Sequence, residues 1–481
     1  MTRVAFVQNL AYDYLGVMYL SAVLKRAGHE VDAFILERGE RALAHAVSDF
    51  RPDLVAFSCT TGIHHWALDF AGYLKRQQSV TTIFGGPHPT FFPEIIEHPS
   101  VDIICRGEGE EAIVEIADKL GARRPLTDTL NCFFKLNGHI VRNDIRPLIQ
   151  DLDSLPNPDR TVYREKFPFL QKSQGNFMAR RGCPFRCSFC FNHALQKLYR
   201  GMGPFVRFRT PERVVAEIAE VSARWNLRTV YMQVDTFILN KSWLKEFTKL
   251  YRERIGLPLL CLVRADQTDE ETIAALKYAG AKNIFFGIES GDESLRNDVL
   301  KKGVTDEDIR RTVGLLRKHG IPFRTYNMVG LPGETLPQAL KTLKLNAELR
   351  TDFPWCAIFH PFPGTELGKF VEQSNLLTRS PEDAHPSFFK ESVLRSEHSN
   401  EIANLQKLFY YGVQFPRLIP LITRAIHLPP NPVFDLLFLV GYAISLYRSE
   451  NLTLREIVSI GMRNVRQFFY GKRPPAQNTA S

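Results

Sequence analysis

Short apolar runs alternate with amphipathic segments over residues 1–145. The runs with the length and composition of buried strands are Arg3–Gln8, Glu30–Ile35, Leu54–Ser58, Thr81–Phe84 and Asp102–Cys105. Segments between them, such as Tyr19–Ala27 and Trp66–Lys75, space their apolar residues as amphipathic helices do. This alternation predicts an α/β domain: a doubly wound, Rossmann-like parallel sheet with helices on both faces.

Residues 146–172 interrupt this pattern, since they are largely polar and carry several prolines, and we expect a linker there. Over residues 173–385 six further apolar runs recur with helical patterns between them. They are Asn176–Ala179, Thr229–Asp235, Leu257–Arg264, Asn283–Glu289, Phe323–Val329 and Cys356–His360. Six parallel units predict an open, partial TIM barrel with its catalytic groups at the carboxyl ends of the strands.

Residues 386–481 show helical patterns and predict a small helical region with a disordered tail over Pro474–Ser481. The run Val433–Tyr447 is strongly apolar but includes Asp435, and it falls short of the roughly 20 residues of a membrane-spanning helix. We expect a core helix, with an interfacial helix or a lid over an apolar substrate as the alternative.

Composition and charge narrow the class of protein. At 481 residues with 44% hydrophobic and 23% charged residues, the chain is expected to fold into two or three domains. Its net charge of +9 is spread along the chain, so nucleic acid is not an expected partner. Met1–Val7 enters a strand at once and does not have the pattern of a signal peptide. We expect a cytoplasmic protein without a transmembrane span and with at most peripheral membrane contact.

Three cysteines, Cys183, Cys187 and Cys190, stand at C-x3-C-x2-C spacing on a loop just after a predicted strand. Three thiolates can hold a four-iron cluster and leave one iron open for a ligand. The alternative is a zinc site completed by His193 or by a distant residue. The other five cysteines are scattered singly near apolar runs, which predicts buried free thiols in a reducing compartment.

With Phe189 just before its last cysteine, this motif resembles that of the radical S-adenosylmethionine (radical SAM) superfamily. The resemblance implies that the three cysteines bind a [4Fe–4S] cluster whose free iron chelates the methionine moiety of SAM. It also implies a one-electron donor, such as flavodoxin or ferredoxin, and the release of a deoxyadenosyl radical that abstracts hydrogen from substrate.

Polar residues end several of the predicted barrel strands. Gln233 and Asp235 could meet the amino group of the methionine moiety, and Arg264 suits its carboxylate. Glu289, within a Gly-Ile-Glu-Ser-Gly stretch, could accept hydrogen bonds from both ribose hydroxyls, where the resemblance places that contact. Val329 opens a glycine-bearing turn that the resemblance places beside the adenine.

In the first domain, the loops beyond the strands are residues 9–16, 58–62, 85–89 and 106–110. Glycines and hydroxyls there let the backbone approach a large ligand closely. As a set they resemble the cobalamin-binding domain that precedes many radical SAM barrels. Ser58, Thr60, Gly85 and Gly86 then occupy its nucleotide-loop positions.

One family signature is missing from this domain. The Asp-x-His-x-x-Gly sequence that supplies a histidine ligand to cobalt does not occur in the first loop, residues 9–16. The resemblance then implies cobalamin held without a protein histidine ligand. His64, His65 and His88 follow the other loops, and we expect them at the surface.

Together these features predict a cobalamin-dependent radical SAM enzyme similar to the class B methyltransferases. We expect it to methylate an unactivated carbon of a small-molecule substrate, and the apolar C-terminal run favours a lipophilic one. The main alternative is a radical cyclase or rearrangement enzyme on the same scaffold. Weaker alternatives are a methylthiotransferase-like enzyme of transfer RNA and a non-catalytic metal-binding module.

Overall fold

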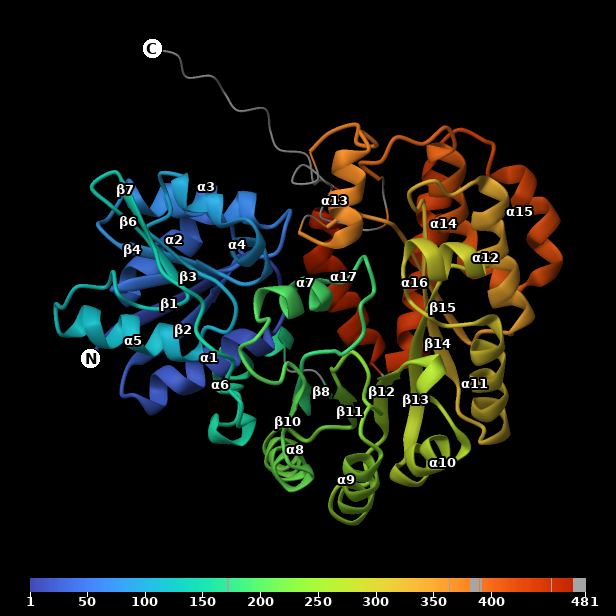
Figure 1. The fold of residues 1–481 in the computed structure, drawn as a ribbon, viewed down its shortest axis with the longest axis horizontal. Helices are drawn as coiled ribbons and strands as arrows, with labels where there is room; N and C mark the ends of the chain where they lie inside the picture. Colours follow the sequence, from blue (N-terminus) through green and yellow to red (C-terminus); the bar gives the residue numbers. More distant parts are fainter. Residues whose placement is uncertain (171–172, 363, 381–388, 390–391, 451, 470–481) are drawn as a thin grey trace.

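The computed structural model describes the chain except residues 171–172, 363, 381–388, 390–391, 451 and 470–481. The predicted disordered tail, Pro474–Ser481, lies outside the described residues. Two sheet domains lie side by side, and a helical C-terminal region packs on the second (Figure 1). The five cysteines outside the motif are buried and free, as expected.

The N-terminal domain is a seven-stranded sheet in the order β2-β1-β3-β4-β5-β6-β7. Its parallel strands are β1 (Arg3–Gln8), β2 (Glu30–Ile35), β3 (Leu54–Ser58), β4 (Thr81–Gly85) and β5 (Ile103–Cys105). The helices between them are α1 (Leu15–Arg26), α2 (Glu40–Phe50), α3 (His64–Lys75), α4 (Pro87–Phe91) and α5 (Glu110–Gly121). Separate apolar cores cover the two faces of the sheet, which confirms the Rossmann-like prediction.

Two antiparallel strands, β6 (Cys132–Leu136) and β7 (His139–Arg142), extend this sheet beyond the prediction. They are joined by Asn137 and Gly138, both with positive φ (49° and 81°). An Asn-Gly pair is the usual sequence of a two-residue hairpin turn, because both residues tolerate that backbone conformation. The hairpin could therefore have been found in the sequence.

The second domain contains six parallel strands in the order β15-β14-β13-β12-β11-β8. They are β8 (Gln174–Phe177), β11 (Thr229–Met232), β12 (Leu259–Val263), β13 (Ala281–Glu289), β14 (Phe323–Val329) and β15 (Phe353–Ile358). The outer helices are α8 (Pro211–Trp225), α9 (Lys241–Arg254), α10 (Glu270–Ala279), α11 (Asp306–Lys318) and α12 (Leu336–Glu348). All six predicted strands are present, so the partial barrel is confirmed; a small ladder of β9 (Arg180–Arg181) and β10 (Arg207–Phe208) lies beside it.

Residues of the expected linker pack between the two domains. Tyr163, in the short helix α6 (Thr161–Arg164), donates a hydrogen bond to Gln8 Oε1 at 2.5 Å. Arg160 lies 2.8 Å from Glu217 of α8 and also donates to the carbonyl of Asn176. The segment therefore fixes the two sheets to each other instead of acting as a loose tether.

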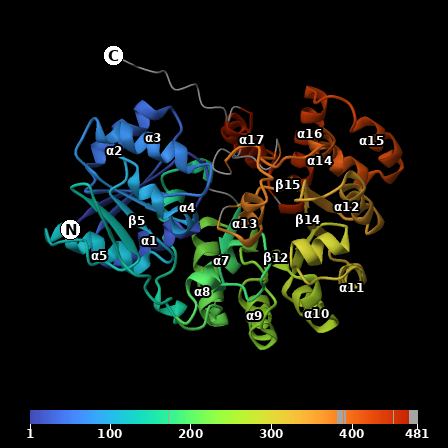
Figure 2. The same ribbon diagram turned by 45° about the horizontal axis from the view of Figure 1, so that its top comes forward.

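The C-terminal helices are α13 (Glu366–Gln373), α14 (Ser399–Gln414), α15 (Ile419–Ala425), α16 (Pro432–Glu450) and α17 (Leu454–Phe469). Helix α16 contacts the edge strand β15, and Glu456 of α17 accepts a hydrogen bond from the backbone of Ser173, next to the other edge strand β8. These two helices thus cross the open side of the barrel, and Figure 2 shows α17 between the N-terminal domain and β15.

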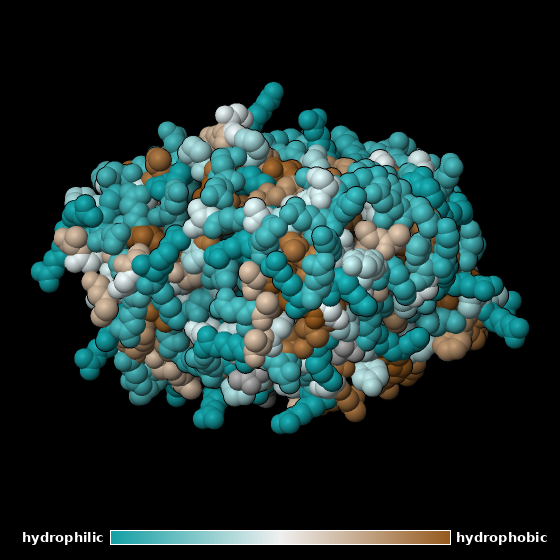
Figure 3. Space-filling view, turned by 90° about the horizontal axis from the view of Figure 1, so that it is seen from below, coloured by the Kyte–Doolittle hydropathy of each residue, from teal (hydrophilic) through white to brown (hydrophobic). Residues whose placement is uncertain are grey.

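Most of the surface seen from below is hydrophilic, with small scattered apolar areas (Figure 3). In the described part of the chain, no helix has the length and apolarity needed to cross a membrane. The apolar run at residues 433–447 forms most of α16, whose Phe434 and Gly441 face the protein interior. The opposite face exposes apolar side chains, so the expectation of a core helix holds for one face only; the exposed residues are Val433, Leu436, Val440, Ile444 and Tyr447.

Candidate active site

The cysteine motif lies on the loop between β9 and helix α7 (Phe191–Leu198). Cys183 and Cys187 are buried and Cys190 is partly buried. Ser188 fixes the loop to the barrel, because its N–H and its hydroxyl donate to the carbonyls of Leu300 and Val299 at 3.0 and 2.6 Å. The loop is therefore held by backbone contacts that leave the thiols available as ligands.

Nitrogen donors lie beside two of the thiols. Arg264 Nη1 is 3.6 Å from Cys187 Sγ, and Asn192 Nδ2 is 3.7 Å from Cys190 Sγ. Burial raises the pKa of the Cys190 thiol to about 11 and also raises the pKa of Cys183. A bound metal deprotonates such thiols, and N–H groups nearby stabilise the resulting sulfur charge. These donors fit a cluster ligated by the loop.

A zinc site on the same loop would need a fourth ligand. His193, the nearest one in sequence, instead has its Nδ1 3.6 Å from the Glu366 carboxylate. Within the described ranges, no three Cys, His, Asp or Glu side chains converge as ligands of one metal ion. A four-iron cluster makes a different demand, since each thiolate binds its own iron.

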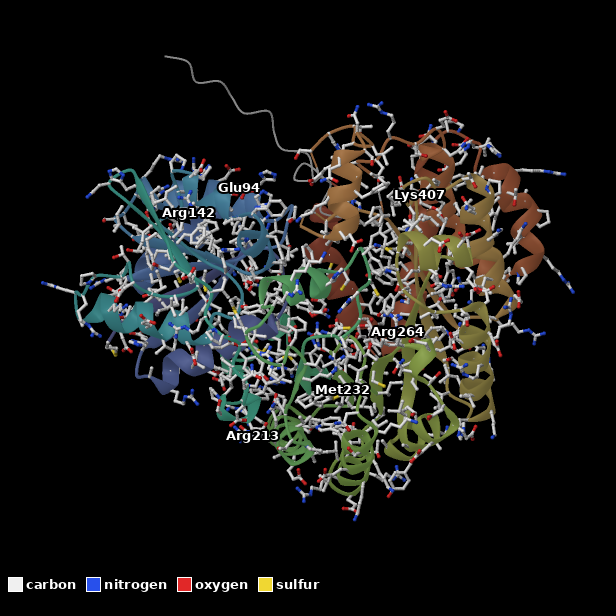
Figure 4. The ribbon with its side chains drawn as sticks, viewed as in Figure 1. Glu94, Arg142, Arg213, Met232, Arg264 and Lys407 are labelled. Carbon is white, nitrogen blue, oxygen red and sulfur yellow. The ribbon has the colours of Figure 1, made fainter. Side chains whose placement is uncertain are left out.

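The side chains predicted at the ends of β11 and β12 lie around this loop. Asp235 and Gln233 are exposed, and Asp235 accepts a hydrogen bond from Asn192 Nδ2 at 2.7 Å. Arg264 extends from the end of β12 over the ring of Phe185, with its guanidinium carbon 3.8 Å from the ring centroid (Figure 4). Arg264 also lies 2.7 Å from Asp266. Its contacts with Phe185 and Cys187 make this arginine part of the packing of the cysteine loop.

Glu289 has an unusual backbone conformation, with φ at +66°. A non-glycine residue in this region is strained, and such strain is found at functional sites. Its Oε1 accepts a hydrogen bond from Lys302 Nζ at 2.7 Å. A side chain at Gly287 would come within 1.9 Å of that oxygen, so the glycine leaves room for the carboxylate in this position. The buried Arg296 donates to the next carbonyl, that of Ser290, and thereby holds the turn.

The turn after β14 presents backbone, and not the side chain of Val329, to the barrel. The side chain of Val329 is fully buried among helices α12 and α14, so only its backbone faces the barrel edge. Glu334 Oε2 accepts hydrogen bonds from Gly330 N and Leu331 N at 2.5 and 3.2 Å. Burial raises the pKa of Glu334 to about 7.

Phe189, Met328 of β14 and Leu331 belong to one apolar cluster. The ring before the last cysteine therefore lies in the same cluster as the end of β14, close to the turn that carries Glu334. Sequence reasoning identified Phe189 but missed Asn192 and Lys302. Asn192 could have been suspected because it follows the last cysteine closely, whereas no pattern marks Lys302.

The edge of the N-terminal sheet is lined by small residues. Ser58 is partly buried and Thr60 exposed, on the loop after β3. Gly86 has φ at +95°, and a Cβ on it would lie 2.9 Å from the carbonyl oxygen of Cys59. With Gly85 beside it, this turn brings the backbones of two neighbouring loops together and leaves their outer surface free of large side chains.

The prediction that the histidines near these loops lie at the surface was wrong for two of them. His64 and His88 are each 2% exposed, and their rings stack with centroids 3.7 Å apart. Thr61 Oγ1 lies 3.1 Å from His88 Nδ1. Burial lowers the pKa of His88 to about 4, so this imidazole is neutral at neutral pH.

The loop at residues 106–110 joins the two domains. Glu108 lies 2.8 Å from Arg207 and 3.1 Å from Arg181, both in the β9–β10 ladder. Burial alone would raise the pKa of Glu108, but these two arginines lower it below its ordinary value. Tyr199 packs against the same loop, and its hydroxyl accepts a hydrogen bond from the N–H of Glu108 at 3.0 Å. This loop therefore contributes to the docking of the two domains.

The two carboxyl edges meet at an aromatic junction. Phe91, in α4 after the Gly85–Gly86 turn, stacks on Phe191, which directly follows Cys190, with centroids 5.0 Å apart. Gln233 Nε2 donates to the hydroxyl of Tyr12, on the first loop of the N-terminal domain, at 3.3 Å. The loops predicted for cobalamin thus adjoin the loop that carries the cysteines.

Comparisons with known proteins agree with this arrangement. A family model described as the radical SAM superfamily matches residues 180–345, and one described as the B12 binding domain matches residues 5–117. An uncharacterized methyltransferase of Pyrococcus horikoshii is 30% identical over 373 residues, which cover 76% of this chain and 79% of that protein.

A second relative has another printed activity. The anaerobic magnesium-protoporphyrin IX monomethyl ester cyclase of Rubrivivax gelatinosus is 27% identical over 372 residues, or 73% of this chain and 65% of the cyclase. The solved structure of OxsB, a cobalamin-dependent S-adenosylmethionine radical enzyme with aqua-cobalamin and S-adenosylmethionine bound, has a TM-score of 0.66 at 15% identity. That likeness covers 97% of this chain and 75% of OxsB, and it shows the shared fold.

Fold and site together define an enzyme with a radical SAM barrel behind an N-terminal B12-binding domain. The chain belongs to the radical SAM superfamily, as a cobalamin-dependent member with methyltransferase relatives. A [4Fe–4S] cluster, SAM and cobalamin are the cofactors that this membership supports, in agreement with the sequence predictions.

Proposed function

We propose that this enzyme transfers a methyl group to an unactivated carbon of a small molecule. The observation that carries the proposal is the junction of the two carboxyl edges, where Phe91 stacks on Phe191 and Gln233 contacts Tyr12. A methyl donor held by the first domain and a hydrogen-abstracting radical formed in the second must reach the same substrate carbon. Adjoining loops meet that requirement.

Residues at different positions in the site would bind different cofactors. Cys183, Cys187 and Cys190 would hold the cluster. The exposed Asp235 and the side chain of Glu289 would orient SAM by accepting hydrogen bonds from its amino group and its ribose. When bound, the cluster and SAM supply a deoxyadenosyl radical, and cobalamin supplies the methyl group.

On the other edge, the turn of Ser58, Thr60, Gly85 and Gly86 would accept the cobalamin nucleotide, because its glycines carry no side chain that would hinder close approach of the backbone. Phe189 and the aromatic junction would shield the reacting groups from water. The neutral, buried His88 already contacts Thr61 and stacks on His64, which supports binding of cobalt without a histidine from this chain.

A radical cyclisation without methyl transfer is the second candidate, and the similarity to the Rubrivivax cyclase favours it specifically. The two reactions differ in the fate of the methyl group of SAM. The reconstituted, reduced enzyme is incubated with SAM that carries a deuterated methyl group, and the mass of the protein-bound cobalamin is measured by mass spectrometry. Uptake of the deuterated methyl group supports methyl transfer. Cleavage of SAM to deoxyadenosine without that uptake would contradict it.

A further inference from the structure

The inner face of the barrel is arranged in levels along its strands. Side chains two residues apart on a strand share a face, so Phe285 and Glu289 of β13 point to the same side, as do Arg324, Tyr326 and Met328 of β14. Glu289 and Met328 belong to the carboxyl end, where the cysteine loop lies. The residues before them therefore form lower levels of the same interior.

The middle level is a continuous row of aromatic rings that runs from β11 to α16. Ring centroids are 5.8 Å apart for Tyr231 and Phe285, 6.3 Å for Phe285 and Tyr326, and 6.3 Å for Tyr326 and Trp355. Trp355 then meets Tyr442 of α16 at 4.9 Å. Phe285 is buried, whereas the other four keep part of their surface exposed. We call these five residues the aromatic tier.

Below the aromatic tier, the ion pair of Arg324 and Glu450 closes the interior of the barrel. Arg324 Nη1 lies 2.8 Å from Glu450, at the end of α16, and Arg324 also donates to the hydroxyl of Ser449. Burial alone would lower the pKa of Arg324, but Glu450 raises it above its ordinary value, so the guanidinium stays charged beside this carboxylate. The guanidinium is therefore already paired and is not placed to bind a carboxylate of the substrate.

The aromatic tier lies one step down the strands from residues near the two loops that would hold the cofactors. Tyr231 precedes Gln233, the residue that contacts the first loop of the B12-binding domain, by two positions. Tyr326 precedes Met328, which shares an apolar cluster with Phe189, by two positions. Two residues of a strand span about 7 Å. A ring system resting on the tier would therefore present its upper edge between the cysteine loop and the cobalamin loops.

We propose that the aromatic tier is the substrate platform and that the substrate carries a flat, uncharged aromatic or conjugated ring system. This inference rests on the proposed function and adds the substrate class. Aromatic side chains recognise such rings by stacking and edge-to-face contacts, which a flexible alkyl chain does not reproduce. The paired Arg324 and Glu450 offer no free charge to the lower end of the ligand.

The test uses the full-length protein, reconstituted with cluster and cobalamin, and two neutral probes with equal numbers of carbon atoms. Binding of 2-naphthol and 1-decanol is measured by equilibrium dialysis. We expect 2-naphthol to bind at least about 5-fold more tightly. Tyr326→Leu and Tyr442→Leu should each weaken its binding about 5- to 10-fold, whereas Tyr442→Phe, which keeps the ring, should stay within about 2-fold.

Tyr447→Leu is the matched control, because Tyr447 lies on the same helix and is 54% exposed. It should bind both probes like the wild-type protein. Equal affinity for 1-decanol and 2-naphthol would overturn the proposal in favour of an aliphatic substrate, and unchanged binding in both leucine variants would overturn the platform. Iron and cobalt counts on each variant show whether its cofactor sites are intact, and uptake of the deuterated methyl group by the wild-type protein separates these results from a failure of the proposed function.

Discussion

The two carboxyl edges that face each other in this enzyme are built from different chemistry. On the barrel edge, charged and amide side chains contact one another and the cysteine loop, as Asn192 does with Asp235 and Lys302 with Glu289. On the edge of the N-terminal sheet, the corresponding loops carry glycines and small hydroxyl residues. The barrel edge thus offers polar side chains to its ligands, whereas the edge of the first domain offers exposed backbone and room for a large ligand.

A strongly charged loop of the first domain, residues 106–110, supports this contrast. The charge of Glu108 is paired with Arg181 and Arg207 of the barrel domain through salt bridges. On the barrel edge, we therefore expect single side-chain substitutions to weaken cofactor binding strongly. On the edge of the N-terminal sheet, we expect only changes of backbone shape to do so.

The sharpest break is expected on the cysteine loop. Replacing Cys187 by Ala removes one of three thiolate ligands and should abolish retention of the four-iron cluster, as measured by iron count and visible spectrum after anaerobic reconstitution. Cys261→Ala is the control, since that thiol is equally buried but lies within β12. Iron retained by Cys187→Ala and lost by Cys261→Ala would refute the assignment.

A backbone change should have the next largest effect. Gly86→Ala places a Cβ 2.9 Å from the Cys59 carbonyl at φ +95°, so the turn must distort. We expect cobalamin binding to weaken at least about 10-fold while iron content stays unchanged. Gly314→Ala, in α11 with nothing within 4 Å of the added carbon, should change neither. Normal cobalt content in Gly86→Ala would remove the backbone argument.

On the barrel edge, Glu289→Gln keeps the shape of the side chain but removes its charge. Hydrogen bonds to a charged group contribute about 1.5–3 kcal/mol, so SAM should bind roughly 10- to 100-fold more weakly in equilibrium dialysis. Glu253→Gln, on the exposed side of α9, is the matched control. Unchanged SAM affinity in Glu289→Gln would show that Lys302, and not SAM, is the only partner of this carboxylate.

The buried imidazole of the first domain predicts a pH dependence of stability. The pKa of His88 is about 4 in the folded chain and about 6.5 unfolded, so the unfolded chain binds more protons between these values. Its contribution, up to about 3 kcal/mol, is complete above pH 6.5 and is lost as the pH falls towards 4. Denaturant unfolding at pH 7.5 and 5 should therefore show a smaller difference for His88→Phe than for the wild type. An equal difference would count against the shifted pKa.

The smallest effect is expected for a side chain on the same edge. Thr60→Ala removes an exposed hydroxyl from the loop after β3. If backbone and space dominate there, cobalamin affinity should change by less than about 3-fold, which corresponds to one solvent-exposed hydrogen bond. A loss as large as that of Gly86→Ala would erase the contrast between the two edges.

The sequence allowed the sheets to be predicted because each strand is a short apolar run and each outer helix has its own amphipathic pattern. The cysteine spacing and the stretch around Glu289 were equally legible, since both lie within a few residues. Contacts between distant segments were not. The pairing of Lys302 with Glu289, the stacking of His64 on His88 and the role of Arg264 in the cysteine loop depend on tertiary packing that no local pattern records.

The most direct test of the central claim is a metal count after anaerobic reconstitution with iron, sulfide and hydroxocobalamin, followed by desalting. Two adjoining cofactor edges predict about four iron atoms and one cobalt atom per chain, with cobalt lost in Gly86→Ala and iron lost in Cys187→Ala. Iron retained without cobalt would contradict the account. The first domain would then serve a substrate or a partner, and the proposal of methyl transfer would fall.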